Sequence, residues 1–231
     1  MNQRPSDDLP AAFARLGGTE DRQVWSELWD GLCHQGCVYE DSYPALPFLA
    51  ATATGRAPGE PRDAVLMAGL IASAADEERT ARYGEEIAAL LPVARSLLAE
   101  ETHDPVSFVY LLQCVLAFEG ERLWSAGRLE GLFEGEYEID CPSCGSGLFI
   151  AFGEDGPFAS AGDYVTGDPA RTELLPADPA ALAPLPARLH RTAAGAGHEG
   201  TARGLTYLFG GAVCPDCGTG FEVAEQVESR Y

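Results

Sequence analysis

The chain has 231 residues, 46% of them hydrophobic, and its 15 basic and 36 acidic residues give a formal net charge of −21. This length suits one large domain or two small ones. No apolar run approaches the roughly 20 residues that span a bilayer, and the acidic start MNQRPSDDLPAAF lacks the apolar core of a secretion signal. We therefore expect a cytoplasmic protein without a membrane segment. The acidity argues against a phosphate-binding surface, because nucleic-acid binding depends on Lys and Arg.

Every basic residue of the chain is Arg, and there is no Lys. A lysine Schiff base and a P-loop lysine are therefore excluded. Codons for Arg, Ala, Gly and Pro are rich in GC, whereas those for Lys are not. The composition thus indicates a high-GC bacterial genome, such as that of an actinobacterium.

Residues 1–134 predict a helical-repeat domain. Apolar residues recur at helical spacing after six start signals, at Thr19, Ser42, Pro61, Thr80, Asp104 and Glu121. The fourth helix should run to Glu101 with a kink at Pro92, and the sixth to Phe133. Three helix pairs of roughly 40 residues each have the length of HEAT-type units. The expected fold class is mainly α, with HEAT-like pairs arranged as an α-solenoid or as an irregular bundle.

Two copies of the motif CPxCG stand in the second half of the chain. They place paired cysteines at the four positions Cys141, Cys144, Cys214 and Cys217. Two such knuckles offer four thiolates in a tetrahedron, which suits Zn²⁺. Apolar residues alternate before and after the first knuckle (Tyr137, Ile139, Leu148, Ile150, Phe152) and follow the second (Phe221, Val223). This strand–knuckle–strand pattern is typical of a zinc ribbon.

The separation of the knuckles is unusual, because residues 145–213 lie between them, against roughly 15–20 residues in a simple four-cysteine site. We favour one split zinc ribbon over residues 135–231. A redox-active CxxC pair and a disulfide framework are the alternatives. In a four-thiolate site no position is open to substrate, so we expect one structural Zn²⁺ per chain and no catalytic metal.

The insertion between the knuckles has a pattern of its own. Residues 153–186 are rich in proline and predict a loop, in which Asp163–Thr166 can add a short strand. Ala187–Ala194 and Thr201–Phe209 predict two short helices, which together form a helical hairpin at about 180–210.

Two stretches of the chain carry a family resemblance. WxxLWxxLCHQGxVYxxSYxALPFL at 25–49 resembles the opening of HEAT-repeat-like proteins of actinobacteria. GHEGTARGLTYLFGGAVCPDCGTGFEV at 197–223 resembles the C-terminal end of the same group, with its split CPxCG zinc-ribbon knuckle. The resemblance implies a helical-repeat fold, a cytoplasmic location and a binding role, since no catalytic residues are assigned in that group. Some of its members resemble immunity proteins that accompany bacterial toxins.

The other candidate sites are weaker. Cys33, His34 and Cys37 form C-H-x-x-C, which is either part of a second metal site or, as we prefer, a pair of packed cysteines beside a turn. Cys114 lies among the apolar residues of the predicted fifth helix, so we expect it to be in the core. No GxSxG or HExxH motif occurs, so we expect no catalytic residues. A distant Cys–His pair with His103, His190 or His198 is the remaining catalytic alternative.

Two classes of function therefore remain. The first is a non-catalytic protein-binding scaffold, immunity-like or regulatory, whose acidic surface attracts a basic protein partner. The second is a transcription-associated accessory protein whose zinc ribbon contacts RNA polymerase or nucleic acid. Only three arginines, Arg188, Arg191 and Arg203, cluster near the ribbon, so nucleic acid is the less favoured partner.

Overall fold

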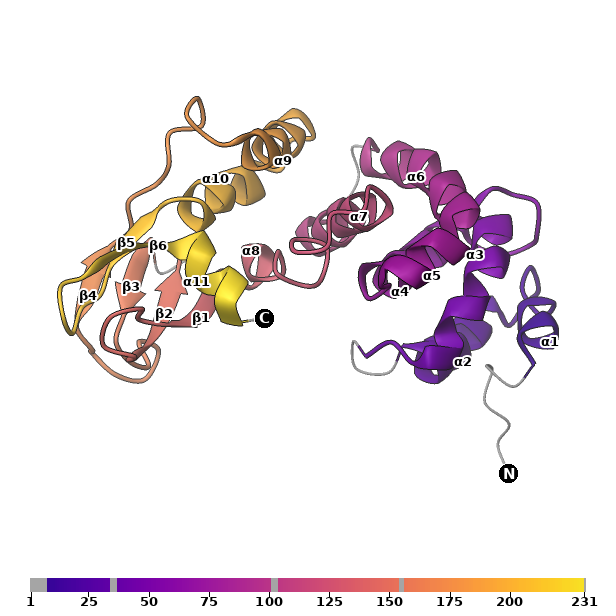
Figure 1. The fold of residues 1–231 in the computed structure, drawn as a ribbon, viewed down its shortest axis with the longest axis horizontal. Coiled ribbons are helices and arrows are strands. Elements are labelled where there is room, and N and C mark those ends of the chain that lie inside the picture. Colours follow the sequence, from indigo (N-terminus) through magenta and orange to yellow (C-terminus); the bar gives the residue numbers. More distant parts are fainter. Residues whose placement is uncertain (1–7, 34–36, 101–103, 154–155, 231) are drawn as a thin grey trace. The chain divides into compact units, whose positions relative to one another are not determined.

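The structure, a computed structural model, describes residues 8–33, 37–100, 104–153 and 156–230 (Figure 1). The chain divides into two compact units. The first comprises residues 1–100 and 110–127, and the second comprises residues 101–109 and 128–231. The helix α7 (Pro105–Phe118) therefore contributes residues to both units.

Helices build the first unit. In chain order they are α1 (Leu9–Phe13), α2 (Asp21–Leu32), a 3-10 helix (Glu40–Ala45), α3 (Leu46–Ala53), α4 (Pro61–Ser73), α5 (Glu77–Arg82) and α6 (Gly84–Leu98). Helix α2 buries one face, made of Val24, Trp25, Leu28 and Leu32, as its spacing predicts. Helices α3, α4 and α6 pack on one another around side chains that solvent does not reach, including Leu46, Leu49, Met67, Ile71 and Leu90.

Two of the expected helices of this unit differ from the prediction. The predicted fourth helix is two helices, because α5 begins earlier, where the Asp76 side chain accepts the N–H of Arg79, and the chain bends at Tyr83 before α6. Most of the predicted sixth helix is turns. The carboxylate of Glu121 accepts the N–H groups of Leu123 and Trp124, and Gly127 adopts φ +81°, so a helix does not continue there.

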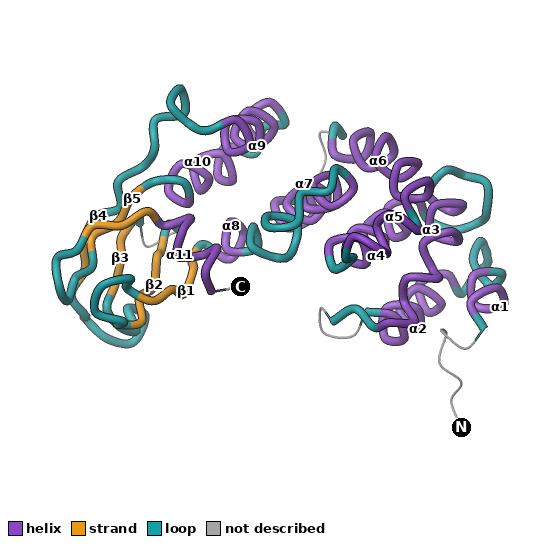
Figure 2. Tube along the Cα trace, in the orientation of Figure 1, coloured by secondary structure: helices purple, strands orange, loops and turns teal. Residues whose placement is uncertain are grey.

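Two small antiparallel β sheets and four further helices build most of the second unit (Figure 2). After α8 (Gly131–Glu134), four antiparallel strands form one sheet in the order β1 (Glu136–Asp140), β2 (Gly147–Ala151), β3 (Phe158–Ser160), β4 (Arg171–Glu173). The strands β5 (Gly211–Val213) and β6 (Gly220–Glu222) form a second, two-stranded sheet. The helices α9 (Pro184–Gly195) and α10 (Glu199–Leu208) pack on each other as the predicted hairpin, and α11 (Val223–Arg230) packs on β1.

Three details of the second unit correct the sequence prediction. The stretch 153–186, predicted to be a loop, contains the strands β3 and β4. Asp163–Thr166 is a turn and not a strand, because the Asp163 carboxylate accepts the N–H groups of Val165 and Thr166 at 2.9 and 3.2 Å. Val223 begins α11 instead of continuing the strand, and it is buried together with Val227 one helical turn later.

The mainly helical character and the small antiparallel β region around the knuckles are thus confirmed. The regular stacking of a HEAT-like solenoid stays a prediction. Among the described residues, no helix combines the length and the hydropathy that crossing a bilayer requires.

Candidate metal centre

The structure brings all four knuckle cysteines to one point of the second unit. The Sγ atoms of Cys141, Cys144, Cys214 and Cys217 all lie within 4.8 Å of one another. Two separations join the knuckles directly: Cys141 to Cys217 at 3.7 Å and Cys144 to Cys214 at 3.8 Å. The prediction that these cysteines form one cluster that can bind a metal ion is therefore confirmed.

Each knuckle is a tight turn at the end of a β hairpin, β1–β2 for the first and β5–β6 for the second. In the first, the N–H of Cys141 donates to the carbonyl of Ser146 (2.8 Å) and the N–H of Gly145 donates to the carbonyl of Cys141 (2.9 Å). The second repeats both bonds at 2.9 Å, from Cys214 to Thr219 and from Gly218 to Cys214.

The glycine of each knuckle has a conformational role. Gly145 and Gly218 adopt φ +73° and +74°, in the left-handed region that a residue with a Cβ rarely enters. This reversal lets the chain turn back after the second cysteine, so that both thiols of a knuckle point to the same side. The motif CPxCG therefore encodes a ligand pair by its backbone as well as by its cysteines.

The spacing of the sulfurs fits a tetrahedral metal. Four sulfurs about 2.3 Å from a central Zn²⁺ lie about 3.8 Å from one another. The two separations between the knuckles, 3.7 and 3.8 Å, match this tetrahedral edge, and no two of the four sulfurs lie more than 4.8 Å apart. A disulfide would need about 2.05 Å between its sulfurs, and all the described cysteines are free thiols. The geometry thus favours a metal site over the disulfide framework that the sequence left open.

The four thiols differ in exposure. Cys141 and Cys214 are buried, with 3% and 1% of their surface exposed, whereas Cys144 and Cys217 are exposed. Burial raises the pKa of Cys214 to about 12, although the N–H groups of Cys217 and Asp216 act against this shift. Hydrogen bonds from Thr219, first its hydroxyl and then its N–H, lower the pKa of Cys217 to about 6. Binding by four thiolates must therefore displace a proton from the buried side of the site.

Contacts between the two sheets hold the knuckles in place. The hydroxyl of Thr172 in β4 donates to the carbonyl of Val213, which directly precedes Cys214. Leu175 and Gly211 exchange two backbone hydrogen bonds of 2.8 and 2.9 Å. On the first knuckle's strand, Arg230 of α11 pairs with Glu138 at 3.2 Å. Segments that are remote in sequence thus fix the two hairpins beside each other.

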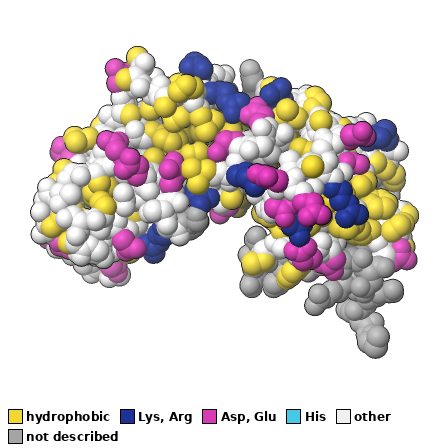
Figure 3. All heavy atoms as spheres, in the orientation of Figure 1, with side chains coloured by type: hydrophobic (Ala, Val, Ile, Leu, Met, Phe, Trp, Pro, Cys, Tyr) yellow, Lys and Arg dark blue, Asp and Glu magenta, His cyan; other side chains and the backbone are white. Residues whose placement is uncertain are grey.

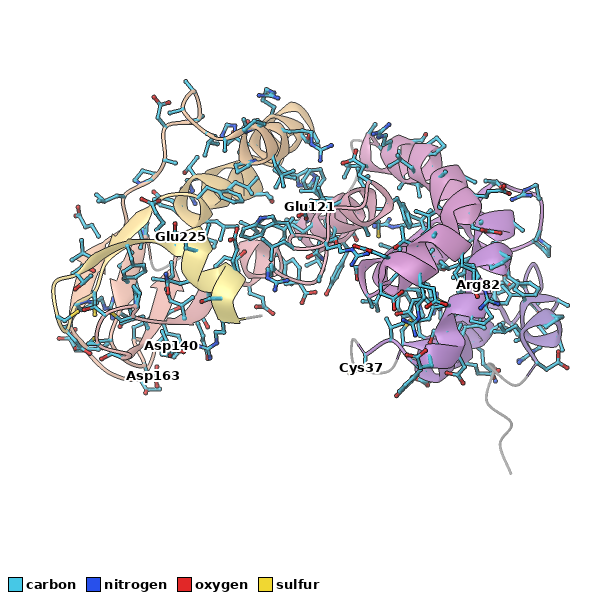
Figure 4. All side chains as sticks on the ribbon, viewed as in Figure 1. Cys37, Arg82, Glu121, Asp140, Asp163 and Glu225 are labelled. Atoms are coloured by element: carbon cyan, nitrogen blue, oxygen red, sulfur yellow. The ribbon has the colours of Figure 1, made fainter. Side chains whose placement is uncertain are left out.

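The weaker candidates do not join this centre. Cys33 is buried at the end of α2, and Cys114 is buried in α7. Cys37 is exposed (Figure 4), so the expectation that Cys33 and Cys37 are both packed is wrong for Cys37. Within the described residues, the knuckle cysteines are the one group of metal-binding side chains that lie together. His34 and His103 lie outside the described residues. His198 stacks on Phe108 with ring centroids 4.0 Å apart.

Sequence reasoning missed two side chains beside the metal centre. The hydroxyls of Ser146 and Thr219 lie 3.3 Å from the Sγ atoms of Cys144 and Cys217. The signal was present, because the repeated motif extends beyond CPxCG: the chain has CPSCGSG at 141–147 and CPDCGTG at 214–220. A hydroxyl-bearing residue thus follows the turn glycine in both copies.

Comparisons of the chain with protein-family models, with curated protein sequences and with solved structures gave no match.

Proposed function

We propose that the cysteine cluster binds one Zn²⁺ per chain as a structural ion. The observation that supports this is the match between the sulfur separations and a tetrahedral four-thiolate site, 3.7 and 3.8 Å against about 3.8 Å. Iron suits the same donors, and elemental analysis of the purified protein distinguishes the two metals. A cytoplasmic location agrees with this assignment, since its reducing conditions keep thiols free to bind metal.

On this basis we propose that the protein acts by binding a basic protein partner and not by catalysis. A metal with four thiolate ligands keeps no position for water or substrate, so it supplies no nucleophile. The ion instead holds the hairpins β1–β2 and β5–β6 together. The α9–α10 hairpin precedes β5 in the chain, and α11 follows β6. The protein would then be a non-catalytic scaffold, immunity-like or regulatory in its role.

The charge of the surface supports a basic partner. The net charge of −21 means that an excess of carboxylates remains even when every arginine has an acidic partner. Figure 3 shows acidic side chains spread over the visible faces of both units. Such a surface accelerates the approach of a cationic protein and repels nucleic acid.

Three consecutive acidic residues, Asp76–Glu78, stand at the start of α5 and have two different roles. Asp76 caps α5 and forms an ion pair with Arg79, so its negative charge is partly neutralised within the protein. Glu77 and Glu78 are exposed in the first turn of the same helix. These two glutamates are therefore the positions at which charge can be reversed without removing the cap.

Affinity capture from the native host, followed by association kinetics with the captured partner, tests this function. We expect the association rate to fall with rising salt, because exposed charges are screened over about 8 Å at physiological ionic strength. The double variant Glu77→Arg/Glu78→Arg should associate about tenfold more slowly. The pair Glu225→Arg/Glu228→Arg, which changes net charge equally on α11, is the matched control.

Three results would contradict the proposal. An association rate that does not change with salt concentration would contradict the electrostatic part of the proposal. Salt-dependent retention on a DNA column, with RNA polymerase among the captured proteins, would favour the transcription-associated alternative. Turnover of a substrate that is lost when one of the four histidines is replaced would show that the protein is an enzyme.

A further inference from the structure

The two exposed thiols of the metal centre each face a hydroxyl group. The Sγ of Cys144 lies 3.3 Å from the Oγ of Ser146, and the Sγ of Cys217 lies 3.3 Å from the Oγ1 of Thr219. The arrangement occurs once in each knuckle, on the cysteine that is open to solvent.

The direction of these hydrogen bonds follows from the chemistry of a bound thiolate. A thiolate that ligates a metal has no proton, so it can only accept, and the hydroxyl beside it must donate. Donation to a charged acceptor is stronger than donation between neutral groups. The exposed thiolates are the pair that water, acid and competing ligands reach first. A fixed donor beside each one disperses its negative charge and holds the sulfur in place.

Ser146 and Thr219 also fix their knuckles through the main chain. The carbonyl of Ser146 accepts the N–H of Cys141 at 2.8 Å, and the carbonyl of Thr219 accepts the N–H of Cys214 at 2.9 Å. Each residue therefore touches both cysteines of its knuckle, the first through its carbonyl and the second through its hydroxyl. Because the carbonyl bond survives any side-chain change, the hydroxyl can be tested alone.

We propose that Ser146 and Thr219 are positioning residues for the metal, and that their hydroxyls donate to the thiolates of Cys144 and Cys217 and slow the loss of the ion from its exposed side. This inference rests on the proposed metal site. It assigns to two residues a role that the four ligands do not have. Groups that hydrogen-bond to metal ligands commonly change metal affinity 10–100-fold when they are removed.

The test compares metal retention in the full-length chain and its variants. Ser146→Ala and Thr219→Val remove one hydroxyl each, Thr219→Ser keeps a hydroxyl, and Ser143→Ala changes an exposed serine of the same knuckle. Zinc loss to excess chelator is followed in time, and affinity is measured by competition. The Co²⁺-substituted protein reports sulfur-to-metal charge-transfer absorption, which moves to lower energy when a thiolate loses a hydrogen-bond donor.

We expect Ser146→Ala and Thr219→Val each to lose zinc about tenfold faster and the double variant to bind about 10–100-fold more weakly, while Thr219→Ser and Ser143→Ala behave as the wild type. Equal retention and unshifted Co²⁺ spectra in the double variant would overturn the inference while leaving the metal site intact. A wild-type chain that binds no metal would overturn the site itself. A Thr219→Ser variant that loses zinc as fast as Thr219→Val would show that the methyl group, and not the hydroxyl, matters.

Discussion

Gly69 of α4 faces Cys114 of α7 so closely that a Cβ added to Gly69 would lie 2.3 Å from the Cys114 Sγ. The same Cβ would lie 2.9 Å from the Cβ and 3.1 Å from the Cα of Cys114. Glycine is therefore required where these two helices pack in the first unit. The buried Cys114 fills the space that the missing side chain leaves, which accounts for a cysteine outside the metal centre.

Gly69→Ala should destabilise the protein by about 1–3 kcal/mol, because the added methyl overpacks a close helix contact. Urea unfolding measures the change. Gly200→Ala in α10 is the control, since its Cβ would meet nothing within 4 Å, and replacing a helical glycine there should stabilise by about 0.5–1 kcal/mol. Adding Cys114→Ala to Gly69→Ala should recover part of the loss. If Gly69→Ala were as stable as Gly200→Ala, the helices α4 and α7 would not pack this closely.

Replacing one ligand should empty the metal centre. Cys217→Ser is expected to lower zinc from one per chain toward zero and to lower the melting temperature of the second unit, since metal binding and folding are coupled in such sites. Elemental analysis and calorimetry check both effects. Cys37→Ser, which changes an exposed cysteine of the first unit, should keep one zinc. Metal loss in both variants would place a ligand outside the knuckles.

The cysteines should react with an alkylating agent in a fixed order. Burial raises the pKa of the Cys33 thiol to about 12 and that of Cys114 to about 12, so neither supplies thiolate to iodoacetamide near neutral pH. In the metal-loaded protein, the exposed Cys37 should be labelled first. Chelation should then release Cys144 and Cys217. Mass-spectrometric mapping gives the order, and native labelling of Cys33 as fast as Cys37 would contradict the buried packing.

The start of α7 should depend on pH. Hydrogen bonds from Ser107, first its side chain and then its N–H, lower the pKa of Asp104. A lowered folded pKa means that the ionised carboxylate stabilises the fold above the unfolded pKa of about 3.9. This contribution is lost as the pH falls through the folded pKa. Asp104→Asn keeps an N-cap acceptor but cannot titrate.

Urea midpoints of the wild type and of Asp104→Asn, compared from about pH 6 downward, isolate this group because the other acids are common to both chains. The advantage of the wild type at the higher pH should shrink as the solution becomes acidic. A difference that stays constant over the whole range would mean that Asp104 does not carry the cap charge.

The sequence predicted the parts of the fold that local signals determine. Helix α4 begins at Pro61, and Asp104 accepts the N–H of Ser107 at the start of α7, as the proline and cap signals indicate. The knuckles were predictable because two ligands and a turn glycine fit within five residues. Only the pairing of the two knuckles, 70 residues apart from Cys144 to Cys214, required an assumption about the fold.

What the sequence did not predict depends on contacts between distant residues. The strands β3 and β4 have three residues each, too few for an alternating pattern, and they form by pairing Phe158 with Glu173 and Ala159 with Thr172. Helix α11 has only one pair of apolar residues at helical spacing, Val223 and Val227. It directly follows the strand β6, so Val223 also fits the continuation of that strand. In both cases packing within the second unit overrides a weak local signal.

Because its four cysteines come from two distant segments, the metal centre should hold the protein together after the chain is cleaved between them. The proposed ion, bound by Cys141 and Cys144 on one side and by Cys214 and Cys217 on the other, would join the two ends of the long insertion. A protease cut in the exposed stretch between Asp178 and Ala181 therefore leaves one cysteine pair on each fragment. The two fragments should migrate as one particle under native conditions and separate once a chelator and denaturant remove the metal, as expected of a reversible crosslink between two distant segments.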